Sequence, residues 1–272
     1  MSEDYENIVE VKDMFRQFNG RPVLDGISFN APKGTITVIM GGSGCGKSTL
    51  LRHIIGSLKP DSGEIRIMGK DITTLSESEM NGVRKRFGML FQGSALFNSM
   101  TIGENVAIPL LEHGDLDANI VDIVVKMKME LVGLSGFEHL KPSEISGGMK
   151  KRVALARAIA LDPKLLFCDE PTAGLDPIMT AVVDELTKDL CQKMGMSAIV
   201  VTHDMASAFR IADIMIMLHK GKIVAMGSPD EIRAEMDNGK NPILKQFING
   251  EADGPIPFRQ SSDGYLKSLM GN

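Results

Sequence analysis

The most constraining feature of this chain is a glycine-rich segment over residues 40–51, which reads MGGSGCGKSTLL. It fits the phosphate-loop pattern GxxxxGK[ST], in which glycines let backbone N–H groups approach phosphate oxygens closely. A helix that starts near Gly46 would add its positive dipole end to the attraction for the same anion. The segment therefore predicts a binding site for a nucleoside triphosphate.

The residues on either side of this loop support the prediction. The apolar, β-branched run 35–39 predicts a strand, and the amphipathic run 49–58 predicts a helix. Lys47 is expected to reach the β- and γ-phosphates, and the Ser48 hydroxyl to ligate Mg²⁺. A glycine-rich turn that matches by chance is the alternative, which the flanking strand and helix disfavour. We expect ATP contacts along the whole loop, at Gly41, Gly42, Ser43, Gly44, Cys45, Gly46, Lys47, Ser48 and Thr49.

Composition and charge restrict the kind of partner. The 272 residues carry a net charge of -5, which argues against a nucleic-acid binder that relies on a broad basic surface. Cys45, Cys168 and Cys191 are far apart in the sequence, so neither a zinc site nor a disulfide framework is expected. No run approaches the ~20 apolar residues that span a bilayer, and the acidic N-terminus does not resemble a signal peptide. If the protein works at a membrane, we expect another chain to hold it there.

We predict an α/β fold with an antiparallel β part at its start. Alternation of apolar and polar residues predicts strands over 8–15 and 64–68, with a further strand over 23–30. Later in the chain, apolar runs at 164–168 and 197–202 alternate with helical patterns. Such alternation favours a mainly parallel sheet that is covered by helices on both faces.

The middle of the chain has a different character. Helical patterns cover 105–112, 117–133 and 146–160 with few strand signals between them, which predicts an inserted helical subdomain. In the second of these helices we expect one apolar face, formed by Ile120, Val124, Met127 and Leu131.

The residues from Asn241 onward are rich in turn-forming types and are not expected to build a core of their own. A frayed end is one interpretation. Several apolar residues favour docking on a partner or a neighbouring subunit instead: Phe247, Ile256, Phe258, Tyr265, Leu266, Leu269 and Met270.

Polar residues end several of the predicted buried strands. Asp169 and Glu170 follow an apolar run, at the sheet edge where ligands bind in open α/β folds. Asp169 would position Mg²⁺, and Glu170 would orient or deprotonate the attacking water. Gln92 and His203 end two other strands, where Gln92 could contact Mg²⁺ or water and His203 the γ-phosphate. A purely structural role is the alternative for each residue taken alone.

A second glycine motif, Ser146-Gly147-Gly148, opens another predicted helix; we call it the SGG segment. Its helix N-terminus is a second place where an anion could bind. Because the first loop already holds the phosphates, the SGG segment is best explained if it serves the nucleotide of another subunit.

Together these motifs resemble the nucleotide-binding subunits of ABC transporters over about residues 8–235. The resemblance rests on 41–48, Gln92, the SGG segment, 169–170, 173–176 and His203. It implies a P-loop NTPase with a RecA-like core at 8–92 and 155–236, a helical subdomain at 93–154 and a C-terminal extension for subunit contacts at 237–272. It also implies a head-to-tail dimer that closes over two ATP molecules. In it Glu170 is the catalytic base, Phe18 stacks on the base of ATP, Asp176 lies in the loop that links the two sites, and His203 is the switch histidine.

A narrower likeness comes from Met149, which stands where Gln or Glu usually ends the signature, and from the segments 91–101, 104–110 and 247–258. These are similar to the ATPases of Mla (MCE-type) systems, which move phospholipids between the two membranes of Gram-negative bacteria. The likeness implies a permease dimer, an MCE-domain lipid-binding protein and a STAS-domain subunit as partners, at the cytoplasmic face of the inner membrane. Leu96, Phe97 and Met100 would help form the groove that receives the permease, with core packing as the alternative.

Other users of the same ATPase core fit the sequence less well. DNA-repair and chromosome ATPases insert long coiled coils or zinc modules, for which residues 93–144 leave no room. Translation-type relatives need two such cores in one chain. A different bacterial importer or a lipoprotein-release pump remains the alternative to phospholipid transport.

Overall fold

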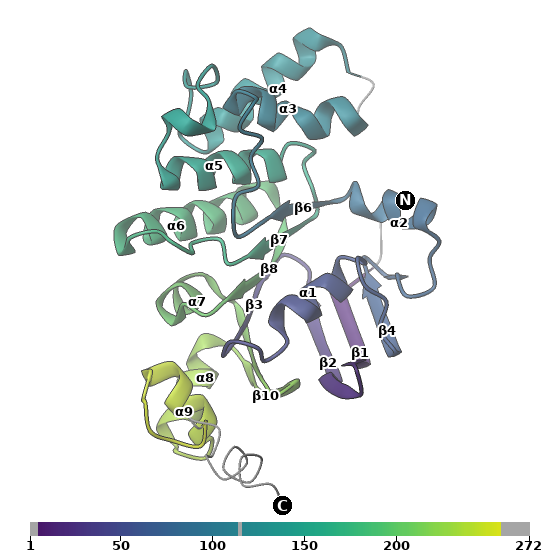
Figure 1. Cartoon of the computed structure of the whole chain (residues 1–272), viewed down its shortest axis with the longest axis vertical. Helices are drawn as coiled ribbons and strands as arrows, with labels where there is room; N and C mark the ends of the chain where they lie inside the picture. Colours follow the sequence, from purple (N-terminus) through teal and green to yellow (C-terminus); the bar gives the residue numbers. More distant parts are fainter. Residues whose placement is uncertain (1–4, 114–115, 257–272) are drawn as a thin grey trace, which may run out of the picture.

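The structure is a computed structural model that describes residues 5–113 and 116–256 (Figure 1). Two sheets form its centre. An antiparallel four-stranded sheet has the order β2-β1-β4-β5, and a six-stranded sheet has the order β10-β9-β3-β8-β7-β6. The strands are β1 (Asn7–Phe18), β2 (Arg21–Pro32), β3 (Ile36–Gly41), β4 (Ser62–Ile67), β5 (Lys70–Asp71), β6 (Phe87–Leu90), β7 (Leu165–Asp169), β8 (Ser197–Thr202), β9 (Ile214–His219) and β10 (Lys222–Gly227).

The larger sheet is parallel except at one edge, as the alternation of strands and helices predicts. β9, β3, β8, β7 and β6 pair in parallel, whereas β10 forms an antiparallel hairpin with β9. The helices are α1 (Lys47–Ile54), α2 (Glu77–Arg84), α3 (Ile102–His113), α4 (Ala118–Leu131), α5 (Gly147–Ala158), α6 (Pro177–Met194), α7 (Met205–Ile211), α8 (Pro229–Asp237) and α9 (Pro242–Asn249), with a short 3-10 turn at Pro142–Glu144.

The two faces of the larger sheet are buried in two different cores. Val38 and Met40 of β3 point into a core formed with the helices that include α3 to α7, whereas Ile39 points into a core shared with α1 and the antiparallel sheet. Because every residue of β3 is buried, the strand is apolar on both sides rather than alternating. This double burial fixes the strand that leads into the phosphate loop.

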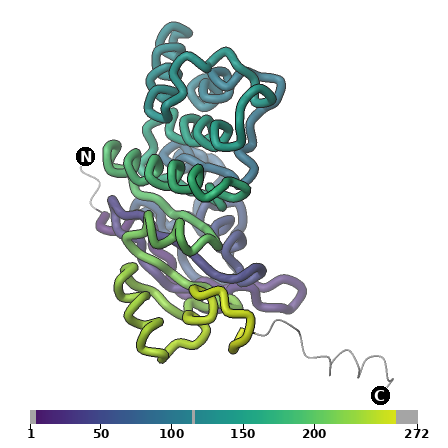
Figure 2. The backbone as a smooth tube through the Cα atoms, turned by 90° about the vertical axis from the view of Figure 1, so that its left-hand side faces the viewer, coloured from purple at the N-terminus to yellow at the C-terminus, as the bar shows by residue number. Residues whose placement is uncertain are grey.

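Helices α3, α4 and α5 lie together at one end of the molecule, and α8 and α9 lie at the other (Figures 1 and 2). Helix α5 approaches β6 very closely: a Cβ added at Gly88 would lie 2.1 Å from the Ala158 carbonyl oxygen. A glycine at this position therefore lets the helix that begins at the SGG segment rest directly on the sheet.

The expected apolar face of α4 is wrong at three of its four positions, because only Val124 of the four packs against the core. Ile120, Met127 and Leu131 are exposed, and the helix instead buries Val121, Val125, Lys128 and Met129 against the core. The helix carries apolar residues on both sides, so periodicity alone offers two possible faces. The buried face contains a lysine because the Lys128 ammonium pairs with Asp162.

One helix limit and the packing of the C-terminal segment also differ from the expectation. Helix α1 ends at Ile54, four residues before the predicted end, because the chain turns through Gly56 at a φ of +71°. After Asn241 the chain forms α9, whose Leu244 is fully buried in the main core and whose Phe247 packs against it. Residues 242–249 thus pack on their own chain, although the region was not expected to form a core. Ile256 is half-buried, while Phe258, Tyr265, Leu266, Leu269 and Met270 lie outside the described residues.

Candidate functional site

The polar residues predicted at strand ends come from four neighbouring strands. β3, β8, β7 and β6 are adjacent and parallel, so their carboxyl ends meet at one edge of the sheet. β3 leads to the phosphate loop, His203 follows β8, Asp169 ends β7, and Gln92 comes shortly after β6. The fold therefore brings these sequence-distant residues to one edge.

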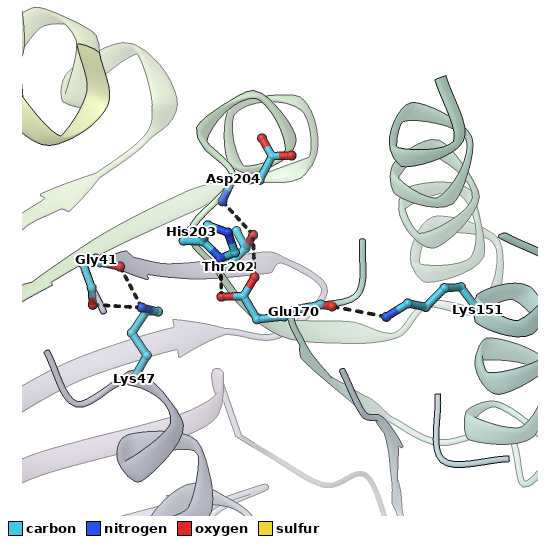
Figure 3. A network of polar contacts seen from close by, with 8 residues as sticks. Gly41, Lys47, Lys151, Glu170, Thr202, His203 and Asp204 are labelled. Atoms are coloured by element: carbon cyan, nitrogen blue, oxygen red, sulfur yellow. Dashed lines mark hydrogen bonds and ion pairs between the residues drawn. The ribbon is translucent and has the colours of Figure 1, made fainter. Parts of the chain in front are cut away.

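The phosphate loop wraps around the Lys47 side chain. The Lys47 ammonium donates hydrogen bonds to the carbonyl oxygens of Gly41 at 2.7 Å and Gly42 at 3.1 Å (Figure 3). Gly41 has a φ of +150°, and a Cβ there would lie 2.3 Å from the Leu218 carbonyl oxygen. Glycine is thus required both for the backbone conformation and for the contact with β9.

A small cavity opens beside this loop. It has a volume of about 140 Å³ and is lined by Val23, Gly44, Gly46, Lys47, Ser48 and Thr49. Gly46 is the N-cap of α1 and has a φ of +112°. Because the helix starts at the end of the loop, its first N–H groups, which have no partner within the helix, lie beside the loop. Backbone donors, a helix N-terminus and an ammonium group make this cavity suitable for phosphate.

The two adjacent carboxylates have different surroundings. Burial raises the pKa of Asp169, and the nearby Glu170 raises it further, whereas Arg52 and Lys47 act in the opposite direction. The Glu170 carboxylate lies 2.8 Å from His203 Nδ1 and accepts a longer hydrogen bond from Thr202 Oγ1 at 3.4 Å (Figure 3). Glu170 is thereby held at the sheet edge with its carboxylate beside an exposed imidazole.

Glu170 also has an unusual backbone. Its φ of +48° lies in the left-handed region, which costs a non-glycine residue about 1–2 kcal/mol. Its N–H donates to the Val201 carbonyl at 2.8 Å, and its carbonyl accepts from the Ala173 N–H at 3.2 Å. Such local strain occurs where the surroundings fix a residue in one position.

The SGG segment is built as a helix cap. Ser146 Oγ accepts a hydrogen bond from the Met149 N–H at 3.2 Å and so forms the N-cap of α5. Ser146 and Gly147 are exposed, whereas Gly148 is buried where α5 meets Met179 of α6. The exposed helix N-terminus can therefore receive a ligand from outside the chain.

Two predicted ATP contacts stand apart from the loop cavity. Phe18 is 41% exposed and has the Arg16 guanidinium 4.6 Å from its ring centre. Asp176 caps helix α6, where its carboxylate accepts hydrogen bonds from the N–H groups of Ile178 and Met179 at 3.0 Å each. Neither residue, nor the SGG segment, lines the cavity beside Lys47.

The residues available for Mg²⁺ are few. Within 5–113 and 116–256, no three His, Cys, Asp or Glu side chains are grouped so that they could hold a metal ion. A hydroxyl, an amide and one carboxylate from Ser48, Gln92 and Asp169 fit Mg²⁺, which binds through one or two carboxylates together with phosphate oxygens and water. The site thus suits a metal that arrives with its nucleotide. The same stretches of chain hold no helix that is long and apolar enough to cross a membrane.

Sequence reasoning missed three contributors to this site. Val23 lines the loop cavity, Thr202 contacts Glu170, and Lys151 contacts the backbone of both Gln92 and Glu170. A signal existed only for Lys151, which follows Gly148 by three positions and so lies on the buried face of the same helix.

Comparison with known proteins agrees with this geometry. Residues 24–173 match the family model described as ABC transporter. The chain is 45% identical to the intermembrane phospholipid transport system ATP-binding protein MlaF of Escherichia coli (strain K12), over 99% of both chains. It is 40% identical to the probable ribonucleotide transport ATP-binding protein mkl of Mycobacterium leprae, over 94% of this chain and 72% of that protein.

Solved structures give the same result. The chain is similar to cbiO1 from Clostridium perfringens, part of an ABC transporter complex, with a TM-score of 0.80 and 30% identity over 86% of this chain and 93% of that one. It is also similar to a dimeric ATP-binding cassette bound to ADP and Pi, with a TM-score of 0.74 and 30% identity over 81% and 98% of the two chains. The chain therefore belongs to the ABC transporter family, as one of its ATP-hydrolysing subunits.

Proposed function

We propose that this chain is the ATPase subunit of a transporter that moves phospholipids between the inner and outer membranes and so maintains the lipid asymmetry of the outer membrane. The observation that carries the cargo is the 45% identity, over 99% of both chains, to an E. coli protein named for intermembrane phospholipid transport. The identity includes the C-terminal region, which lies beyond the residues matched by the general family model.

For the reaction, we propose that the phosphate loop holds the triphosphate and that Lys47 contacts its β- and γ-phosphates. Mg²⁺, when bound by Ser48, Gln92 and Asp169, would neutralise charge on the phosphate oxygens. Glu170 then accepts a proton from the attacking water, with its carboxylate oriented by His203. The 2.8 Å contact between His203 and Glu170 supports this arrangement.

A complete site would need a second copy of the chain. The exposed SGG segment of one copy would close over the ATP bound at the phosphate loop of the other, with Phe18 stacking on the base and Asp176 in the loop between the two sites. Ile178, next to that loop, is 76% exposed, which suits an interface. One structural relative is described as a dimer bound to ADP and Pi, which supports a dimer here.

The permease is proposed to dock in a groove of about 430 Å³ between the sheet and the helical end of the molecule; we call it the β6/α3 groove. Phe97, named from the sequence, lines it, whereas Leu96 packs into the main core and Met100 does not line it. Phe91 and Phe97 are exposed aromatic residues of this groove, as expected for a surface that receives a helix of another chain. It is lined by Arg84, Phe87, Gly88, Met89, Phe91, Ala95, Phe97, Ile108, Pro109, Glu112, His113, Arg157, Ala158 and Leu161.

The remaining parts of the proposal follow from the Mla likeness. An MCE-domain protein and a STAS-domain subunit complete the transporter, and the permease holds this chain at the cytoplasmic face of the inner membrane. Residues 8–92 and 155–236 form the nucleotide-binding core, 93–154 the helical subdomain and 237–272 an extension for subunit contacts. Because α9 packs on its own chain, we place those contacts on the exposed side of α9 and beyond it.

The cargo is tested by deleting the gene and measuring phospholipid on the outer leaflet together with detergent sensitivity. We expect both quantities to rise in the deletion strain and to return to normal when the wild-type protein is supplied. The Lys47→Met protein should leave both of them high, because it lacks the ammonium that contacts the phosphates. Lys126→Met, which changes an exposed lysine on α4, should restore them fully. Unchanged outer-leaflet lipid in the deletion strain would exclude this cargo. It would favour another bacterial importer or a lipoprotein-release pump.

A further inference from the structure

Lys151 is a buried lysine that contacts the backbone of the candidate site. Its side chain lies on the inner face of α5, and the residue is only 5% exposed. Its ammonium donates a hydrogen bond to the carbonyl oxygen of Gln92. It donates another, at 3.4 Å, to the carbonyl oxygen of Glu170, which Figure 3 shows. Burial lowers the pKa of Lys151, which is the effect expected for an ammonium taken out of water.

The two carbonyls belong to the ends of neighbouring strands. Gln92 comes after β6 and Glu170 comes directly after β7, and these strands pair in parallel. The Lys151 ammonium therefore joins the backbone of Gln92, a proposed Mg²⁺ ligand, to the backbone of Glu170, the proposed base. A short hydrogen bond from a charged donor is about twice as strong as a neutral one, which applies to the bond that Gln92 accepts. The bond to Glu170 is longer, at 3.4 Å, so the bridge restrains the Gln92 peptide more firmly than the Glu170 peptide.

The effect on Glu170 follows from its strained backbone. A residue with a φ of +48° stays there only while its surroundings hold it. The Glu170 carbonyl accepts hydrogen bonds from Lys151 and from the Ala173 N–H, and together they restrain the peptide plane next to the Cα atom that carries the side chain. Loss of the cation would let this plane rotate and move the carboxylate away from His203.

Helix α5 holds the loop after β6 at a second place. The Arg157 guanidinium donates to the carbonyl oxygens of Ser94 and Ala95, each at 2.7 Å, and both of these residues have positive φ angles. Arg157 also lines the β6/α3 groove. Helix α5 thus begins at the SGG segment and lines the groove through Arg157. Its contact with Glu170 is made by Lys151 alone among the residues of this helix.

We propose that Lys151 is a positioning residue for ATP hydrolysis, which sets Glu170 and Gln92 relative to each other. It touches neither nucleotide nor metal in this role, so it controls the rate of the chemical step and not the affinity for ATP. The proposal rests on the assignment of Glu170 as the base.

A competing explanation is that Lys151 only stabilises the fold. Lys128 provides the matched control, because it is another buried lysine of the helical end, 6% exposed, whose ammonium pairs with Asp162. Its ammonium is bonded to Asp162 and not to the loop after β6 or to Glu170. Lys128→Met should lower the melting temperature yet leave kcat within about twofold of wild type.

The test compares Lys151→Met and Lys151→Arg in the full chain. We measure kcat and KM for ATP, the Kd of a fluorescent ATP analogue and the melting temperature. We expect Lys151→Met to keep Kd within about twofold while kcat falls at least ~10-fold, since displacement of a catalytic group by about 1 Å can cost up to ~100-fold. Lys151→Arg, which keeps a cation there, should give an intermediate kcat.

Folded Lys151→Met protein with wild-type kcat would overturn the proposal, as would a rise in Kd equal to the fall in kcat. If Lys151→Met does not fold, Lys151→Gln, which keeps N–H donors without the charge, replaces it under the same criteria. Glu170→Gln tests the role of Glu170 as the base separately from the role of Lys151. Normal turnover in Glu170→Gln refutes the assignment of the base, whereas loss of turnover there with normal kcat in Lys151→Met refutes the role of Lys151 alone.

Discussion

Breaking the buried ion pair between α6 and α7 should destabilise the protein. Asp184 is 1% exposed, and its carboxylate accepts hydrogen bonds from Arg210 at 2.5 Å and from Ser207 Oγ at 2.7 Å. Helix α7 begins just after His203, and α6 begins just after Asp176. The pair therefore ties together two segments of the proposed site.

Arg210→Met leaves the carboxylate buried with Ser207 as its remaining partner. Removing one member of a buried pair typically costs about 3–5 kcal/mol. The Arg210 side chain is 29% exposed, so water can replace part of its contact, and we expect a loss of about 2–3 kcal/mol. At about 2–4 °C per kcal/mol for a chain of this size, the melting temperature should fall by roughly 4–12 °C.

The loss should depend on pH in a defined direction. Burial raises the pKa of Asp184 above its usual 3.8, and Ser207 and Arg210 oppose this rise. Without Arg210 the pKa rises further, so the folded protein takes up a proton more readily than the unfolded chain does. The cost of the buried charge is present at neutral pH and is relieved as pH falls through the folded pKa. The deficit of Arg210→Met should therefore shrink towards acidic pH.

Thermal unfolding at neutral and mildly acidic pH measures this effect. Asp184→Asn combined with Arg210→Met removes both charges and should recover at least half of the lost stability. Lys193→Met, which breaks an exposed pair with Asp189 on the same helix, should change stability by less than about 1 kcal/mol. Equal stability of Arg210→Met and Lys193→Met would contradict a stabilising role of Arg210, and so would a double variant no more stable than Arg210→Met.

Two further substitutions test how the site is supported. Gly88→Ala places a Cβ 2.1 Å from the Ala158 carbonyl oxygen and should displace α5. We therefore expect a lower melting temperature and a lower kcat. Gly82→Ala is the control and should lower neither quantity, because a Cβ there meets nothing within 4 Å. Leu244→Ala empties a fully buried position on α9 and should cost about 2–5 kcal/mol in denaturant unfolding. Leu111→Ala, at an exposed leucine, should cost under about 0.5 kcal/mol, and equal effects of the two would contradict the packing of α9.

The parts of the site that could be predicted are those that a local pattern specifies. The phosphate loop needs glycines at fixed spacing, and Asp169, Gln92 and His203 each follow an apolar strand. Parallel pairing then brings these strand ends to one edge of the sheet, independently of the structure of the segments that connect the strands. A pattern of a few residues was therefore enough to predict this edge of the sheet.

Features that depend on tertiary contacts could not be predicted in the same way. The buried face of α4 includes Lys128, whose partner Asp162 is distant in sequence, so a search for apolar residues at helical spacing does not find this face. The role of Lys151 depends on two backbone carbonyls that no side-chain pattern reveals. Helix α9 is stabilised by burial of Leu244 in the core of preceding elements, whereas composition alone favoured a tail without a core.

The central claim is that ATP is shared between the phosphate loop of one copy and the SGG segment of another. Sedimentation of Glu170→Gln protein with MgATP tests it most directly, alongside the same protein carrying Ser146→Arg. We predict an ATP-dependent dimer for Glu170→Gln, and a monomer that still binds ATP once the exposed Ser146 is replaced by the bulky, charged arginine. A Glu170→Gln protein that stays monomeric with ATP, or a dimer unaffected by Ser146→Arg, would contradict the claim.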